Sequence, residues 1–345
     1  MKFLHSLFIL ALVLIISDSS AQQPFRNIDR QLDGLNRHFS FTGSVLVAKK
    51  GRIVYQRHVG FADLEHHVLI DSDTKFELAS ITKVFTAVLI LQLVEKGKLK
   101  LDAKVSDYIP AFTRKDSGDI TIHHLLSHTS GIEDFVGLNC PFSDWTEKEF
   151  FAGLQQTPVH FTPGARFEYA SSTYILLRLI IEHVTGQTYE RNLQEHILRP
   201  AGMKSTGVIH NHALLLQRAF GYVNTNEGYE NAMPISNHDI FVGAASVYST
   251  TTDLLKFDRA LYSNTLLSEN LKKEMFTIVR PPYGYGWFIN DDDKDGKTVS
   301  HGGDIFGFTS LIERRLKDQV LIVILSNQQG LDRELIVKLL DETLR

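Results

Sequence analysis

Ser80 and Lys83 are three residues apart in Ser80-Ile81-Thr82-Lys83, at the start of a helix that the sequence predicts over 79–97. Positions i and i+3 share one face of a helix, so the lysine is held against the serine hydroxyl. A desolvated lysine with a lowered pKa can remove the hydroxyl proton and activate the serine as a nucleophile. Four-residue patterns also recur by chance, and the ordinary alternative is a first-turn serine with a surface lysine.

Tyr169 is the second candidate for proton transfer. The segment Tyr169-Ala170-Ser171 follows a turn at 161–164 and precedes a helix predicted over 173–184. A loop just before a helix can aim side chains into a cleft, where a phenol can relay protons. Taken alone, the segment favours a core tyrosine followed by a serine, Ser171 or Ser172, that caps the helix.

His301-Gly302-Gly303 is the third segment with possible chemistry, after a strand predicted at 298–300. Two glycines allow a substrate to lie close to the strand backbone. The backbone N–H just beyond them can then form an oxyanion hole with the N–H of Ser80. The alternative is a glycine hairpin turn beside a surface histidine.

The elements that would position these groups are β-rich at both ends of the chain and helical between them. Residues 43–61 read as a hairpin, and residues from about 101 to 261 as mainly helices and long loops. The predicted C-terminal elements are strands at 283–289, 298–300, 308–313 and 320–325, and a helix at 331–344. This order predicts an α/β (α+β) fold, in which one antiparallel sheet is flanked by helices and carries an inserted, mainly helical lobe.

Composition and the N-terminus narrow the class of protein. The 345 residues carry a net charge of −4 with no basic stripe, which argues against nucleic-acid binding and an anionic membrane surface. Lys2, an apolar run over 3–16 and the small residues before position 22 predict a signal peptide at 1–21 and an exported, periplasmic or secreted protein. An uncleaved anchor is the alternative. Cys140 is the only cysteine, so no intramolecular disulfide is possible.

No metal or cofactor is predicted. Residues 291–296 match the first half of a calcium loop, but Gly302 stands where its bidentate glutamate should fall. The histidine pairs His66-His67 and His123-His124, and His128, lack the spacing of a zinc motif, and surface or hydrogen-bonded roles are favoured for them.

Taken together, the motifs resemble the serine β-lactamase and penicillin-binding-protein superfamily, in its class C β-lactamase-like branch. The resemblance covers about 43–327 and is carried by segments at 76–83, 125–132, 161–164, 169–171, 200–203, 283–287 and 301–303. It implies Ser80 as nucleophile, Lys83 and Tyr169 as acid–base partners, and Asp304 N–H as the second oxyanion donor, with no metal. It also implies one domain over 22–345, with a sheet lobe at about 22–100 and 240–345 and a helical lobe at about 101–239.

Two departures from the family pattern bear on the substrate. Ser171 replaces the usual asparagine that binds a substrate amide, and His301 replaces the usual lysine that suits a substrate carboxylate. Both favour a D-amino-acid peptidase, carboxypeptidase or esterase acting on a less anionic small molecule or peptide. The alternatives are a class C-type β-lactamase and a non-catalytic binding or sensing protein. The oligomeric state stays open.

Overall fold

The computed structural model describes residues 25–38, 40–110, 112, 120–134, 146–233, 237–292 and 296–344. The predicted signal peptide, Cys140 and the centre of the calcium-like loop lie outside these residues. Within the described ranges, no helix is both long and apolar enough to cross a membrane. The same ranges contain no group of three or more potential metal ligands.

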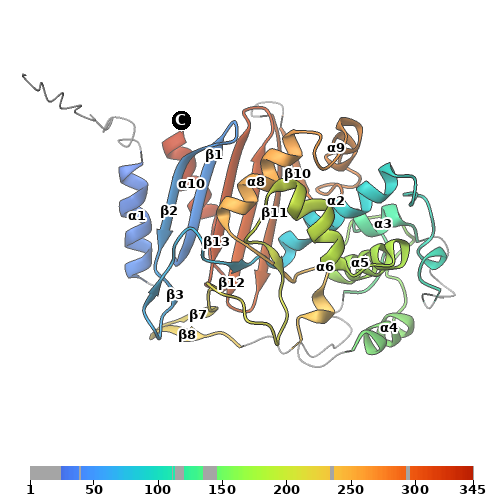
Figure 1. Ribbon diagram of the computed structural model, residues 1–345, viewed down its shortest axis with the longest axis horizontal. Helices are drawn as coiled ribbons and strands as arrows, with labels where there is room; N and C mark the ends of the chain where they lie inside the picture. Colours follow the sequence, from blue (N-terminus) through green and yellow to red (C-terminus); the bar gives the residue numbers. More distant parts are fainter. Residues whose placement is uncertain are drawn as a thin grey trace, which may run out of the picture.

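A six-stranded antiparallel sheet joins the two ends of the chain, as predicted (Figure 1). In spatial order its strands are β10 (Phe288–Asp292), β11 (Gly296–Ile305), β12 (Phe308–Arg315), β13 (Val320–Ser326), β1 (Gly43–Lys49) and β2 (Arg52–Val59). The first strand, β1, pairs with the last, β13, from Gly43↔Ser326 to Lys49↔Val320. This pairing joins the N-terminal and C-terminal strands into one sheet.

Among the described residues, seven short strands lie outside this sheet. They are β3 (Phe61–Asp63), β4 (Val68–Leu69), β5 (Phe76–Glu77), β6 (Gly207–Val208), β7 (Tyr222–Thr225), β8 (Gly228–Asn231) and β9 (Val247–Ser249). In one three-stranded sheet, β9 lies between β5 and β6. Because β5 ends directly before Ser80, this small sheet fixes the entry to the candidate nucleophile.

The helices are distributed over both faces of the large sheet and over the helical lobe. They are α1 (Arg26–Arg37), α2 (Thr82–Glu95), α3 (Ile122–Leu126), α4 (Glu147–Gln156), α5 (Ser171–Thr185), α6 (Tyr189–Leu193), α7 (Arg199–Ala201), α8 (Thr251–Tyr262), α9 (Glu269–Met275) and α10 (Arg333–Leu344). Short 3₁₀ turns are η1 (Ala79–Ile81), η2 (Val105–Asp107) and η4 (Asp239–Phe241), and a π-helical turn, η3 (Gln194–Leu198), links α6 to α7.

Alternation along β1 separates two hydrophobic cores. Val45 and Val47 face a core that contains buried residues of α1 and α10. Leu46 and Ala48 face the larger core, which includes α2, α8 and the helical lobe. A strand with period-two side chains and consecutive apolar residues at 45–48 is thus covered on both faces.

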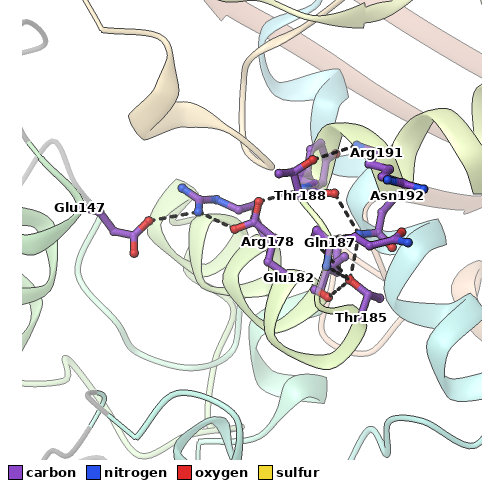
Figure 2. A network of polar contacts seen from close by, with 10 residues as sticks. Glu147, Arg178, Glu182, Thr185, Gln187, Thr188, Arg191 and Asn192 are labelled. Carbon is purple, nitrogen blue, oxygen red and sulfur yellow. Dashed lines mark hydrogen bonds and ion pairs between the residues drawn. The ribbon is translucent and has the colours of Figure 1, made fainter.

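A polar network joins the middle and the end of α5 to α4 and α6 in the helical lobe (Figure 2). Arg178 of α5 donates to Glu182 one turn further along (2.7 Å) and to Glu147 of α4 (3.0 Å). Buried Asn192 of α6 donates to Thr185 Oγ1 (2.9 Å) and the Thr188 carbonyl (2.9 Å), which closes the turn between α5 and α6. The second half of the helix that begins at Ser171 is therefore anchored to its neighbours.

Two predicted strand boundaries were wrong, and one helix was not predicted. The strand predicted at 283–289 begins only at Phe288, because Gly286 has a left-handed φ of 79° and lies against α2. The strand predicted at 298–300 runs on to Ile305, through the two glycines. Helix α1 was not predicted, since only three apolar side chains, Ile28, Leu32 and Leu35, fall on its packed face.

Candidate active site

Ser80 lies in η1, directly before α2. Ala79 has a positive φ of 47°, which is strained for a residue with a Cβ. This strained residue turns the chain sharply from β5 into the helix and leaves Ser80 partly exposed. The N-terminal end of α2 lies beside the Ser80 backbone, so its dipole favours negative charge there.

Lys83, the second residue of α2, is fully buried, which contradicts the alternative of a surface lysine. Its Nζ donates to Ser80 Oγ at 3.0 Å and to the Ala244 carbonyl at 3.0 Å. Burial lowers the pKa of Lys83 to about 7, and the charge of Asp134 opposes this shift. A substantial fraction of the lysine is therefore a neutral base near neutral pH.

Tyr169 meets this pair from the loop before α5. Its ring centroid lies 5.0 Å from Lys83 Nζ. Burial raises the pKa of Tyr169, while its hydrogen bond with Ser80 acts in the opposite direction. The phenol is thus protonated at neutral pH and can pass a proton on.

His128 holds the backbone on both sides of Tyr169. Its carbonyl accepts from Glu168 N–H (2.9 Å), and its Nδ1 accepts from Ala170 N–H (3.2 Å). The imidazole also lies 4.3 Å, centroid to centroid, from the Tyr169 ring. Burial, then the charge of Lys83, puts the pKa of His128 well below its usual value. This neutral ring fixes the direction of the tyrosine.

Strand β11 forms the opposite wall. A Cβ on Gly303 would lie 2.2 Å from the Leu78 carbonyl oxygen, so only glycine allows β11 to lie this close to the Ser80 turn. Strand β10 pairs with β11 only as far as Phe288↔Ser300. The backbone from His301 to Ile305 therefore has one edge that β10 does not pair, on the side where a substrate can bind.

His301 is buried, and both of its ring nitrogens have partners. Nδ1 lies 2.6 Å from the Gly302 carbonyl, which fixes it as the donor, and Nε2 accepts from Tyr283 Oη at 3.0 Å. Burial, followed by the charge of Lys83, lowers the pKa of His301 to about 3. The ring is therefore neutral, and it offers no cation to a substrate.

A cavity of about 1120 Å³ connects these groups. Among its lining residues are six of the predicted site residues: Ser80, Tyr169, Ser171, His301, Gly302 and Asp304. Ser171 begins α5, and its backbone N–H donates to Asp134 Oδ1 at 2.9 Å. The Asp134 carboxylate thus binds a helix N-terminus, and its charge acts on both Lys83 and Tyr169.

The chain has the fold of a class of serine hydrolases that combine a sheet with a helical lobe, and the groups at its cavity fit that class. A family model described as Beta-lactamase matches residues 29–343, and the chain belongs to that family. It is 30% identical over 334 residues to "Penicillin-binding protein 4*" of Bacillus subtilis, covering 89% of this chain and 73% of that protein.

Solved structures agree with this assignment. A penicillin-binding protein from Bacillus halodurans superposes with a TM-score of 0.78 at 28% identity, over 91% of this chain and 99% of that one. The D-amino acid amidase of Ochrobactrum anthropi shares the fold, with a TM-score of 0.80 at 24% identity over 94% and 98% of the two chains. These relatives support hydrolase chemistry in general terms.

The sequence missed three residues that the structure adds to the site. His128 belongs to the segment that carried the resemblance, but its contacts with the Tyr169 loop are long-range. Asp134 follows the same segment. Arg333 comes from α10, lines the cavity and donates to the Gly303 carbonyl of β11; no local pattern marks it.

Proposed function

We propose that this protein is a serine hydrolase that forms an acyl-enzyme at Ser80 on a neutral amide or ester. The observation that carries the proposal is the 3.0 Å contact between Lys83 Nζ and Ser80 Oγ at a cavity that Tyr169 also lines. A buried lysine with a pKa of about 7 has the proton affinity that a general base needs near neutral pH.

In the proposed reaction, Ser80 Oγ attacks the substrate carbonyl carbon while its proton passes to Lys83 Nζ. The new Oγ–C bond pushes the carbonyl electrons onto oxygen, where the Ser80 and Asp304 N–H groups stabilise the charge. Collapse breaks the bond to the leaving group, which takes a proton from Tyr169 Oη, and Lys83 reprotonates the tyrosine. Water then attacks the carbonyl carbon of the acyl-enzyme ester while Lys83 Nζ takes its proton. Collapse breaks the bond between that carbon and Ser80 Oγ, which regains its proton from Lys83, and the acid is released.

The preferred substrates, by this proposal, are D-amino-acid peptides or amides and short-chain esters that lack a carboxylate beside the scissile bond. The neutral, fully hydrogen-bonded His301 supports this choice, because it gives a substrate carboxylate beside it no positive charge to offset the cost of desolvation. A penicillin-recognising enzyme is the second candidate, favoured by the similarity to Penicillin-binding protein 4*.

Pre-steady-state hydrolysis of p-nitrophenyl butyrate tests the proposal. We expect a burst of p-nitrophenol equal to the enzyme concentration, lost in Ser80→Ala and kept in Ser268→Ala, a serine at the N-cap of α9. Efficient nitrocefin hydrolysis without ester or D-alanyl-amide turnover would instead select the second candidate. No burst and no turnover of any of the three substrates would favour a binding or sensing protein.

We also propose that residues 1–21 are removed as a signal peptide and that the mature protein works outside the cytoplasm. The N-terminal sequence of the protein recovered from the exported fraction should begin at Gln22. Recovery of the uncut chain from the membrane would contradict this part of the proposal.

A further inference from the structure

Arg333, at the start of α10, lines the catalytic cavity and forms three hydrogen bonds to residues of β11 and β12. Its Nη1 donates to the Ser310 carbonyl at 2.9 Å and to the Gly303 carbonyl at 3.3 Å. Its Nη2 donates to Asp304 Oδ2 at 2.8 Å. The planar fork of a guanidinium can satisfy several acceptors at once, which a lysine cannot do in the same geometry.

These contacts fix one particular peptide group. Gly303 is paired with Ser310 on β12, and Arg333 contacts the carbonyls of both, so the Gly303 carbonyl points toward β12. A trans peptide is planar, and its N–H points opposite to its C=O. The N–H of Asp304, in the same peptide, is therefore directed to the edge of β11 that β10 leaves unpaired.

The site is shaped to admit the guanidinium. A Cβ on Gly302 would lie 2.5 Å from Arg333 Nη1, so any larger residue would displace the arginine. The Arg333 side chain is only 26% exposed, and its charge is balanced by Asp304. A fixed cation at the carbonyl end of a peptide also polarises that peptide and strengthens its N–H as a donor.

We propose that Arg333 is a positioning residue for acyl transfer, which holds and polarises the Gly303–Asp304 peptide so that the Asp304 N–H stabilises the oxyanion. This inference rests on the proposed function. The arginine acts from the face of β11 that carries Gly302 and Asp304, whereas His301 and Gly303 face the Ser80 turn. Its side chain lines the cavity, but its hydrogen bonds go to the strand, so the proposed effect on the transition state passes through the Gly303–Asp304 peptide.

Kinetics of Arg333→Gln and Arg333→Lys on a neutral p-nitrophenyl ester test this role. We expect kcat to fall by about 10- to 100-fold, less than the loss of a whole oxyanion donor, with KM changed by less than about 2-fold. Arg333→Lys keeps the charge without the fork and should lie between Gln and wild type. Added guanidinium should partly restore kcat in Arg333→Ala, which a purely structural loss would not allow.

The matched control is Arg259→Gln. Arg259 of α8 likewise donates to a backbone carbonyl, that of Gly51, but at the hairpin between β1 and β2, and its loss should leave kcat unchanged. Thermal unfolding of each variant shows whether it is folded at the assay temperature. If Arg333→Gln is not folded, the milder Arg333→Lys is compared with the wild type instead.

Three results would overturn the assignment. An unchanged kcat in folded Arg333→Gln would overturn the role of Arg333. The proposed function would still stand if the wild type shows its Ser80-dependent burst. A rise in KM confined to esters that carry a carboxylate, at constant kcat, would make Arg333 a substrate-binding residue instead. Absence of a burst in the wild type itself would overturn the proposed function and this inference together.

Discussion

Replacing Lys83 by methionine should make the protein inactive and more stable. Methionine has a similar length and no charge, so it fills the buried space without the cost of a desolvated ammonium. The pKa of Lys83 falls from 10.5 to about 7, and at about 1.4 kcal/mol per pH unit this difference corresponds to about 5 kcal/mol.

The net effect is smaller than that difference. At pH 7 about half of the folded protein carries a charged Lys83, so the proton-linked cost to the wild type is about 4 kcal/mol. Loss of the hydrogen bonds to Ser80 and the Ala244 carbonyl destabilises the variant by about 1–2 kcal/mol. We therefore expect Lys83→Met to raise the free energy of unfolding by about 2–3 kcal/mol at pH 7.

The sign of the pH dependence makes the test sharp. Between about pH 7 and 10.5 the unfolded chain binds a proton at Lys83 that the folded protein has released, so wild-type stability rises with pH relative to the variant. The advantage of Lys83→Met should shrink by about 3 kcal/mol between pH 7 and about pH 9.5. Urea unfolding of both proteins at the two pH values measures this change.

A pH-independent difference between the two proteins would refute the reasoning, because it would mean that Lys83 keeps an ordinary pKa. Lys256→Met is the matched control. Lys256 is a partly exposed lysine on α8 that pairs with Asp253 at 2.7 Å, and its replacement should not stabilise the protein at either pH.

Three further predictions concern the reaction. The acylation rate should rise tenfold per pH unit below about 7 and level off above it, as Lys83 loses one proton; a rate that falls over this range in stopped-flow assays would exclude lysine as the base. His128→Ala should lower kcat on p-nitrophenyl esters by about 10- to 100-fold, because it releases the Tyr169 loop. His128→Asn keeps an acceptor for Ala170 N–H and should recover part of the lost kcat. Equal activity of the two variants would contradict this role of His128. Gly303→Ala would place a Cβ 2.2 Å from the Leu78 carbonyl oxygen, so it should abolish the ester burst in a folded protein. A normal burst would show that β11 can move away from the Ser80 turn at no cost.

Local patterns predicted the parts of this structure that depend on near neighbours. The β1–β2 hairpin, strands β12 and β13 and helix α10 follow from their own periodicity. The contact between Ser80 and Lys83 follows from the helical i, i+3 spacing, although η1 begins the turn as a 3₁₀ helix. Sequence resemblance supplied the approach of Tyr169 and β11, which local spacing alone left open.

What the sequence could not predict depends on tertiary contacts. The complete burial of Lys83 requires the loop that carries Ala244, 161 residues away. Tyr283 and His301 form a pair only because the turn before β10 lies against β11. The strain at Ala79 likewise has no local signal, since alanine usually favours an ordinary helix start.

Intact-mass spectrometry and peptide mapping of the mature protein after reaction with a fluorophosphonate test the central claim most directly. The account predicts one adduct per chain, located on Ser80, with a rate that depends on Lys83 and no adduct in Ser80→Ala. An adduct on another serine, or an unchanged rate in Lys83→Met, would contradict it.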